Sequence, residues 1–147
     1  MGKEKSKKPR LGPLVPNTQK RPRISSDPEN FHKKYPSWRI SKMEMVDPFG
    51  WHDLDEPTLA YIRRKLGEFE NRTWGEILNS HHNHNVEIAI LCKEARNRLE
   101  AIRQSDIDEL LSLRLSGPER VWGILSEGVC TLLWWDPNHQ VCPSLKK

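Results

Sequence analysis

The sequence predicts a small α+β domain of two layers, in which helices pack on an antiparallel sheet that ends in a β-hairpin. Three observations support this fold class. Apolar residues recur at helical spacing in residues 56–104, they alternate with period two in residues 111–135, and a short turn joins two apolar runs near the C-terminus. A chain of 147 residues fits one domain. We therefore expect a single domain over residues 36–147, preceded by a tail over residues 1–35.

The tail is predicted from its charge and its prolines. Residues 1–40 carry 11 Lys/Arg and 3 Asp/Glu, a net charge of +8, whereas residues 41–147 carry 13 and 17, a net charge of −4. Residues 1–30 contain five prolines and no periodic apolar pattern, which indicates disorder. Such a basic arm can neutralise phosphates without reading sequence, or it can act only as a solubilising leader.

The first part of the domain is predicted to be an extended segment followed by a helix. Alternation that begins at Trp38 indicates a strand, which ends at the turn sequence of residues 47–50. Apolar residues at helical spacing then predict a helix over about 56–71. Either Asp53 or Asp55 can cap its first turn by accepting hydrogen bonds from free amides.

Two further helices are predicted before the C-terminal strands. Residues 73–76, Thr-Trp-Gly-Glu, match a capping box and indicate a short helix. Residues 81–85, His-His-Asn-His-Asn, are expected to form a polar loop. A short extended piece is possible over residues 86–90, and helical spacing then predicts a third helix over about 92–104.

Three strands are predicted to follow in sequence. Residues 111–115 alternate Leu with polar residues, as in a half-buried strand. Residues 120–125 and 129–135 are apolar runs joined by Ser-Glu-Gly, the strongest hairpin signal in the chain. Because neighbouring strand residues face opposite sides, a sheet covered on one face only would leave either Trp134 or Trp135 facing solvent or a contact.

Two groups of residues near these strands are candidates for phosphate or base contacts. Alternation puts Arg120 and Trp122 on the same side of their strand, where a cation beside an aromatic ring can hold a phosphate and stack a base. A core position for Trp122 is the other interpretation. In the histidine-rich loop, His82 and His84 could contact a substrate, and a solvated loop is again the simpler interpretation.

The end of the last strand offers a titrating group. Asp136-Pro137-Asn138 is ordinary turn chemistry, but a turn does not require the histidine that follows it. The imidazole of His139 titrates near neutral pH and could act as a general acid or base.

Other classes of protein and site are not indicated by the sequence. The sequence shows no long apolar run and no secretory leader, so we expect a cytoplasmic protein without membrane contact. Cys92, Cys130 and Cys142 are an odd number without C-x-x-C spacing, which favours buried free thiols over a disulfide framework. The histidine loop matches metal-ligand spacing poorly, so we predict no metal site and no cofactor.

The residues of the C-terminal strands carry a family resemblance. Residues 111–115, 120–124 and 132–139 resemble the last strands of RelE/ParE-like toxins of bacterial toxin–antitoxin systems. In those toxins an arginine-bearing strand is followed by a hairpin and a short tail with further catalytic side chains. The order of strand, helices and strands is also similar, and the resemblance covers roughly residues 38–142.

The resemblance implies an endoribonuclease, free or ribosome-associated, that cuts mRNA by attack of a ribose 2′-OH and is neutralised by an antitoxin protein. Arg114 and Arg120 would then supply the cations and His139 the acid or base. We expect four further residues to contact the substrate: Trp122, His82, His84 and Asp136. A non-catalytic nucleic-acid- or ribosome-binding module and a protein-interaction domain remain as alternatives.

Overall fold

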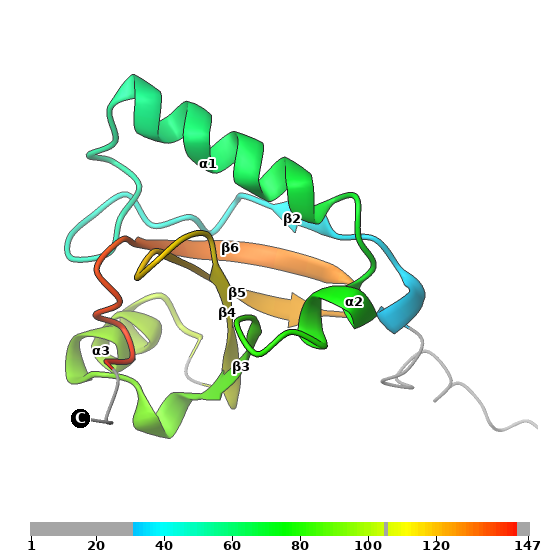
Figure 1. Ribbon diagram of the computed structural model, residues 1–147. Helices are drawn as coiled ribbons and strands as arrows, with labels where there is room; N and C mark the ends of the chain where they lie inside the picture. Colours follow the sequence, from blue (N-terminus) through cyan, green and yellow to red (C-terminus); the bar gives the residue numbers. More distant parts are fainter. Residues whose placement is uncertain (1–30, 105, 144–147) are drawn as a thin grey trace, which may run out of the picture.

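The computed structural model describes residues 31–104 and 106–143, which form an α+β fold with a five-stranded sheet (Figure 1). The predicted tail of residues 1–30 lies outside the described residues. The strands are β2 (Ser37–Arg39), β3 (His84–Glu87), β4 (Glu109–Arg114), β5 (Arg120–Ser126) and β6 (Val129–Asp136). The helices are α1 (Glu56–Phe69), α2 (Trp74–Leu78) and α3 (Lys93–Ala101), with short 3₁₀ helices η4 (Phe31–Lys33) and η5 (Ile88–Ile90).

The sheet is mixed, which corrects the expectation of a purely antiparallel sheet. Its strand order is β2-β6-β5-β4-β3, and β2 pairs in parallel with β6 from Ser37 opposite Val129 to Arg39 opposite Thr131. The other three pairings are antiparallel. Parallel neighbours need a long connection, and the whole domain between β2 and β6 provides it. Sequence alternation alone does not reveal such a long-range partner.

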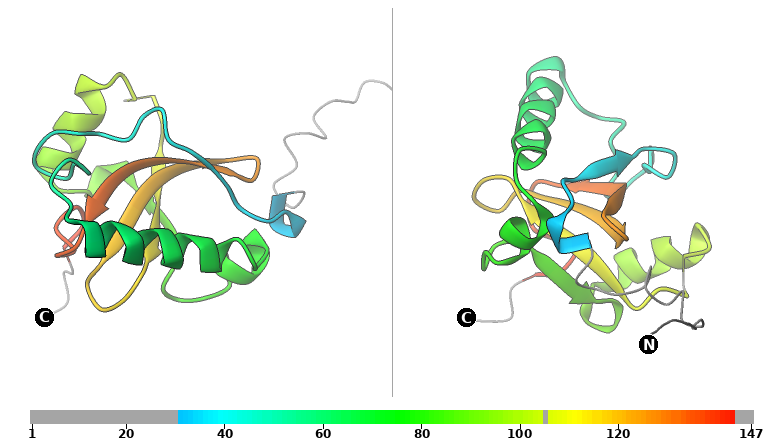
Figure 2. Two further views of the ribbon diagram at one scale, coloured as in Figure 1. Left: turned by 90° about the horizontal axis from the view of Figure 1, so that it is seen from above. Right: turned by 90° about the vertical axis from the view of Figure 1, so that its right-hand side faces the viewer.

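Helices lie on both faces of the sheet, so the predicted two-layer arrangement is also corrected. In Figure 2, α1 and α3 lie on opposite sides of the strands. One core cluster joins α1 and α2 to one face, and includes Ile62, Trp74 and Val121. A second cluster joins α3 to the other face, and includes Leu99 and Leu133.

This double cover explains the position of the two neighbouring tryptophans. Trp134 is 0% exposed and Trp135 is 7% exposed, so the expectation that one of them faces solvent or a contact is wrong. Trp134 packs beside Phe49 with ring centroids 5.4 Å apart, whereas Trp135 packs beside Trp51 at 6.3 Å. Each indole therefore has its own core, one on each side of β6.

Local signals in the sequence are confirmed at the helix starts and at the hairpin. Asp55 caps α1 by accepting from the amide of Thr58 at 3.0 Å, and Thr73 and Glu76 form the capping box of α2. Glu127 and Gly128 join β5 to β6 with φ values of 53° and 90°. Two consecutive positive φ values are typical of the tight turns that match strand twist.

Two segments differ locally from the predicted boundaries. The polar loop is shorter than expected, because its residues His84 and Asn85 belong to β3 and pair with β4. The domain also begins before residue 36. The carbonyl of Lys34 accepts from the amide of Trp74 at 2.9 Å, and Phe31 packs against the first core cluster. Residues 31–35 are therefore part of the folded body.

A buried carboxylate secures the loop between β2 and α1. Glu44, 8% exposed, accepts hydrogen bonds from the Arg98 guanidinium of α3 and from Trp134 Nε1. These bonds hold the pKa of Glu44 below its ordinary value although burial alone would raise it. The loop is thereby fixed to α3 and β6. In the part of the chain that the structure describes, no helix is long and apolar enough to cross a membrane.

Candidate anion-binding site

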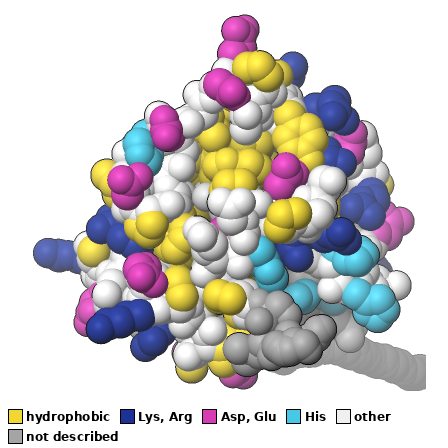
Figure 3. All heavy atoms as spheres, turned by 60° about the vertical axis from the view of Figure 1, so that its left-hand side comes forward, with side chains coloured by type: hydrophobic (Ala, Val, Ile, Leu, Met, Phe, Trp, Pro, Cys, Tyr) yellow, Lys and Arg dark blue, Asp and Glu magenta, His cyan; other side chains and the backbone are white. Residues whose placement is uncertain are grey.

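A pocket of about 450 Å³ is lined by residues of β3, β4 and β5 and by the segment after β6. Of the described residues that line it, none is acidic. Figure 3 shows histidine side chains gathered beside Lys or Arg side chains on one side of the molecule. The pocket brings together most of the predicted site residues, and its polar and aromatic lining includes His81, His82, His84, Arg120, Trp122 and His139.

Two arginines lie side by side next to this pocket: Arg120 lines it, and Arg114 contacts His82, which also lines it. Arg114 at the end of β4 and Arg120 at the start of β5 are cross-strand partners. The carbonyl oxygen of Gly117 accepts from Arg114 Nε at 3.1 Å and from Arg120 Nη1 at 2.7 Å. Both side chains are half-buried, and neither forms an ion pair with a described residue.

The pairing of two like charges is unfavourable in this protein without an anion. Burial and the charge of Arg114 lower the pKa of Arg120, and Asp136 offsets this shift in part. Like charges opposite one another on neighbouring strands are destabilising. Each guanidinium group still has N–H donors that bond to no described acceptor. Such donors can form paired hydrogen bonds to a phosphate.

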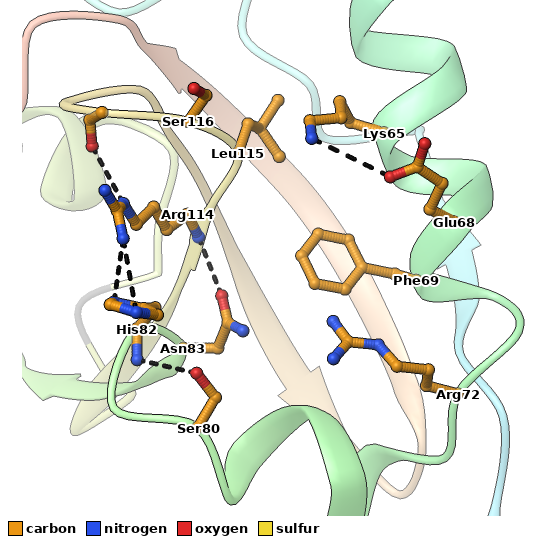
Figure 4. A pocket seen from close by; sticks show the side chains of 11 residues that line it. Lys65, Glu68, Phe69, Arg72, Ser80, His82, Asn83, Arg114, Leu115 and Ser116 are labelled. Atoms are coloured by element: carbon orange, nitrogen blue, oxygen red, sulfur yellow. Dashed lines mark hydrogen bonds and ion pairs between the residues drawn. The ribbon is translucent and has the colours of Figure 1, made fainter.

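His82 holds the first of these arginines. Arg114 Nη1 lies 3.0 Å from His82 Nδ1, and the amide of Arg114 donates to Asn83 Oδ1 at 2.9 Å (Figure 4). Because a guanidinium only donates hydrogen bonds, the imidazole nitrogen that it contacts must be unprotonated. His82 therefore positions Arg114 by accepting its hydrogen bond.

His139 lies in the segment after β6, which turns back toward the pocket. Its φ is 58°, a left-handed conformation that is uncommon for residues other than glycine. Burial lowers the pKa of His139, and the charges of Arg120 and His84 lower it further, against the opposite effect of Asp136. The imidazole is consequently neutral at neutral pH and can accept a proton.

A second histidine approaches the same pocket from β3. His84 Nδ1 lies 3.3 Å from the carbonyl oxygen of Asn85. Because a carbonyl only accepts, Nδ1 carries the hydrogen in this contact, which leaves Nε2 for a ligand. The structure thus combines two imidazoles from separate elements with a guanidinium pair.

The two remaining predicted substrate contacts, Trp122 and Asp136, are buried. Trp122 is 1% exposed, so it forms the floor of the pocket and cannot stack a base on an open face. Asp136, also 1% exposed, accepts from Trp122 Nε1 at 3.1 Å and from the amides of Gln140 and Val141 at 2.8 and 3.0 Å. Its carboxylate fixes the turn that carries His139.

We expect Asp136→Asn to destabilise the fold and to displace His139. The NH₂ group of asparagine would face at least one of the three N–H groups that now donate to the carboxylate. The loss of hydrogen bonds to a buried charged acceptor costs about 1.5–3 kcal/mol. Urea denaturation measures the loss of stability. In an NMR spectrum, the imidazole signals of His139 should shift, whereas those of the distant His52 should not. An unchanged His139 signal would contradict the positioning role of Asp136.

Two residues next to the site were not singled out from the sequence. Lys65 and Arg72 line an adjoining pocket together with His82 and Arg114. Lys65 belongs to a run of basic residues beside the apolar stripe of α1, a pattern that solvated helix faces share. Within residues 31–104 and 106–143, no three or more His, Cys, Asp or Glu side chains are grouped in a way that could hold a metal ion.

Comparison with known proteins adds no relative. No family model matches the chain, and no curated protein or solved structure shows significant similarity to it.

Proposed function

We propose that this protein binds single-stranded RNA and cleaves it as a RelE-like endoribonuclease. The observation that carries the proposal is the guanidinium pair of Arg114 and Arg120, held at one carbonyl without an ion pair among the described residues. Arg120 lines a pocket together with His84 and His139, and Arg114 contacts His82 of the same pocket. Two neighbouring cations that have no carboxylate partner among the described residues favour an anionic ligand. Two histidines next to an anion site supply the acid and base that phosphodiester cleavage needs.

The proposed reaction is an attack of the ribose 2′-OH on the adjacent phosphorus. Neutral His139 takes the 2′-OH proton as the new O2′–P bond forms. Arg114 and Arg120 stabilise the charge that develops on the phosphoryl oxygens. The P–O5′ bond then breaks, and His84 gives a proton to the leaving 5′ oxygen. The products are a 2′,3′-cyclic phosphate and a 5′-hydroxyl.

The resemblance adds a biological setting to this proposal. A RelE-like toxin would cut mRNA in the bacterial cytoplasm, free or on the ribosome, and would be neutralised by an antitoxin protein. The arginine pair and the histidines are the groups that such an inhibitor would have to cover or displace.

A cleavage assay with a matched deoxy substrate tests the proposal. We expect the wild-type protein to cut a single-stranded RNA and to leave 2′,3′-cyclic phosphate ends, detected by sequencing of RNA ends. One 2′-deoxy substitution should abolish cleavage at that nucleotide because it removes the nucleophile. Arg114→Gln and Arg120→Gln should each weaken RNA binding and reduce the slope of log affinity against log salt by about 1. Arg63→Gln, an equal charge change at an exposed position of α1, is the control.

Binding without catalysis is the second candidate, because the guanidinium pair by itself requires only an anion. A wild-type protein that binds RNA in a salt-dependent manner but leaves no new ends would establish this module in place of the nuclease. Failure to bind RNA at low salt would overturn both.

A further inference from the structure

A second pocket, of about 390 Å³, adjoins the anion-binding site on the side of α1. Figure 4 shows its two walls: Lys65 and Phe69 come from α1 and Arg72 from the residues that follow it, whereas His82 and Arg114 come from the opposite side. His82 lines both this pocket and the one that contains His139. The two pockets therefore meet at His82.

The described lining of this second pocket has an excess of positive charge. Its cations are Lys65, Arg72 and Arg114, and its one acidic side chain is Glu68. Glu68 is already engaged, at 3.1 Å by Arg64 and at 3.8 Å by Lys65. The carboxylate of Glu68 thus does not neutralise Arg72 or Arg114.

Arg72 is held in place without a carboxylate partner among the described residues. Its guanidinium carbon lies 5.4 Å from the centroid of the Phe69 ring, and the side chain is exposed. This cation–π contact restrains the side chain of Arg72, and it uses none of the hydrogen-bond donors of the guanidinium. The donors of Arg72 remain available on the same pocket that Arg114 borders.

We propose that this pocket is a second phosphate subsite, where Arg72 and Lys65 bind a backbone phosphate of single-stranded RNA next to the phosphate at Arg114 and Arg120. The inference rests on the proposed function, which places the scissile phosphate at the guanidinium pair. Because the two pockets meet at His82, a polynucleotide can occupy both at once. This favours a polynucleotide ligand over a free anion. A groove of cations that follows the backbone is how single-strand binders gain affinity.

The test compares binding of a dinucleotide and of an oligonucleotide of about eight nucleotides, both 2′-deoxy at the cleaved position, by fluorescence anisotropy. We expect Arg72→Gln to weaken binding of the longer chain about three- to tenfold at low salt and to lower the salt slope by about 1. Dinucleotide affinity should stay unchanged. Lys65→Gln should act in the same direction, and Arg63→Gln on the far side of α1 should change neither affinity.

The outcomes separate this inference from the proposed function. If Arg72→Gln and Lys65→Gln bind and cut long RNA as the wild type does, the subsite is overturned and the nuclease stands. If both variants lose affinity for the longer chain while the wild type cuts no RNA, the subsite stands and catalysis is overturned. If the wild type binds neither oligonucleotide, both proposals are overturned.

Discussion

Replacement of His139 by alanine should lower the rate of RNA cleavage by about 100- to 10,000-fold, the usual contribution of one general acid or base. His139 is the proposed base because burial and the charge of Arg120 lower its pKa, which keeps the imidazole neutral at neutral pH. RNA affinity should change little, since the cations remain. Single-turnover kinetics on a short single-stranded RNA separates the two effects.

The pH profile gives an independent test of the same assignment. A base works only when it is unprotonated, so kcat/KM should rise with pH up to the pKa of His139 and then level off before the acid limb. Because that pKa lies below the ordinary value of 6.5, the rising limb should have its midpoint below pH 6.5. His52→Ala, in a loop where His52 contacts Asp47, should leave the rate and the profile unchanged. Full activity of His139→Ala would remove His139 from the mechanism.

Trp134→Ala should destabilise the domain by about 3–5 kcal/mol, and Trp135→Ala should have a similar effect. The two indoles fill separate cores, and Trp134 also donates to the buried carboxylate of Glu44 at 3.0 Å. Such a loss is a large fraction of the stability of a small domain. Trp134→Phe is therefore the gentler variant, since it keeps most of the volume and removes the hydrogen bond.

Urea denaturation at equal protein concentration measures these losses. Trp38→Ala is the control, because Trp38 is only half-buried beside Trp74 and its loss should cost clearly less. A cost below about 1 kcal/mol for either Trp134→Ala or Trp135→Ala would show that the sheet lacks a second packed face.

The sequence predicted the local elements well because local chemistry determines them. The capping residues Asp55 and Thr73 and the Glu127–Gly128 turn act within a few positions of chain, and all are confirmed. The alternation along β5 is confirmed too: Val121 packs in one core and Trp122 in the other. Period-two alternation states which residues share a face but not what covers that face.

The long-range features could not be predicted, because no local pattern in the sequence determines them. The parallel pairing of β2 with β6 and the burial of both Trp134 and Trp135 depend on partners far apart in sequence. At the site, the expected proximity of Arg120 and His139 follows from the hairpin register, and both line one pocket. The role of Asp136 as an internal anchor could not be foreseen, because a turn aspartate and a buried acceptor have the same sequence pattern.

The two histidines of the site, His139 and His84, lie on segments that should differ in how easily they open. His139 follows β6, an inner strand covered on both faces, and its turn is tied to the buried Asp136, so it opens only when the hydrogen bonds to Asp136 break. His84 lies on β3, an edge strand of four residues with an exposed side, and such strands open locally at low free energy. One half of the site is thus rigid before any ligand arrives. Ligand binding should therefore order mainly the other half, which is β3 with His84.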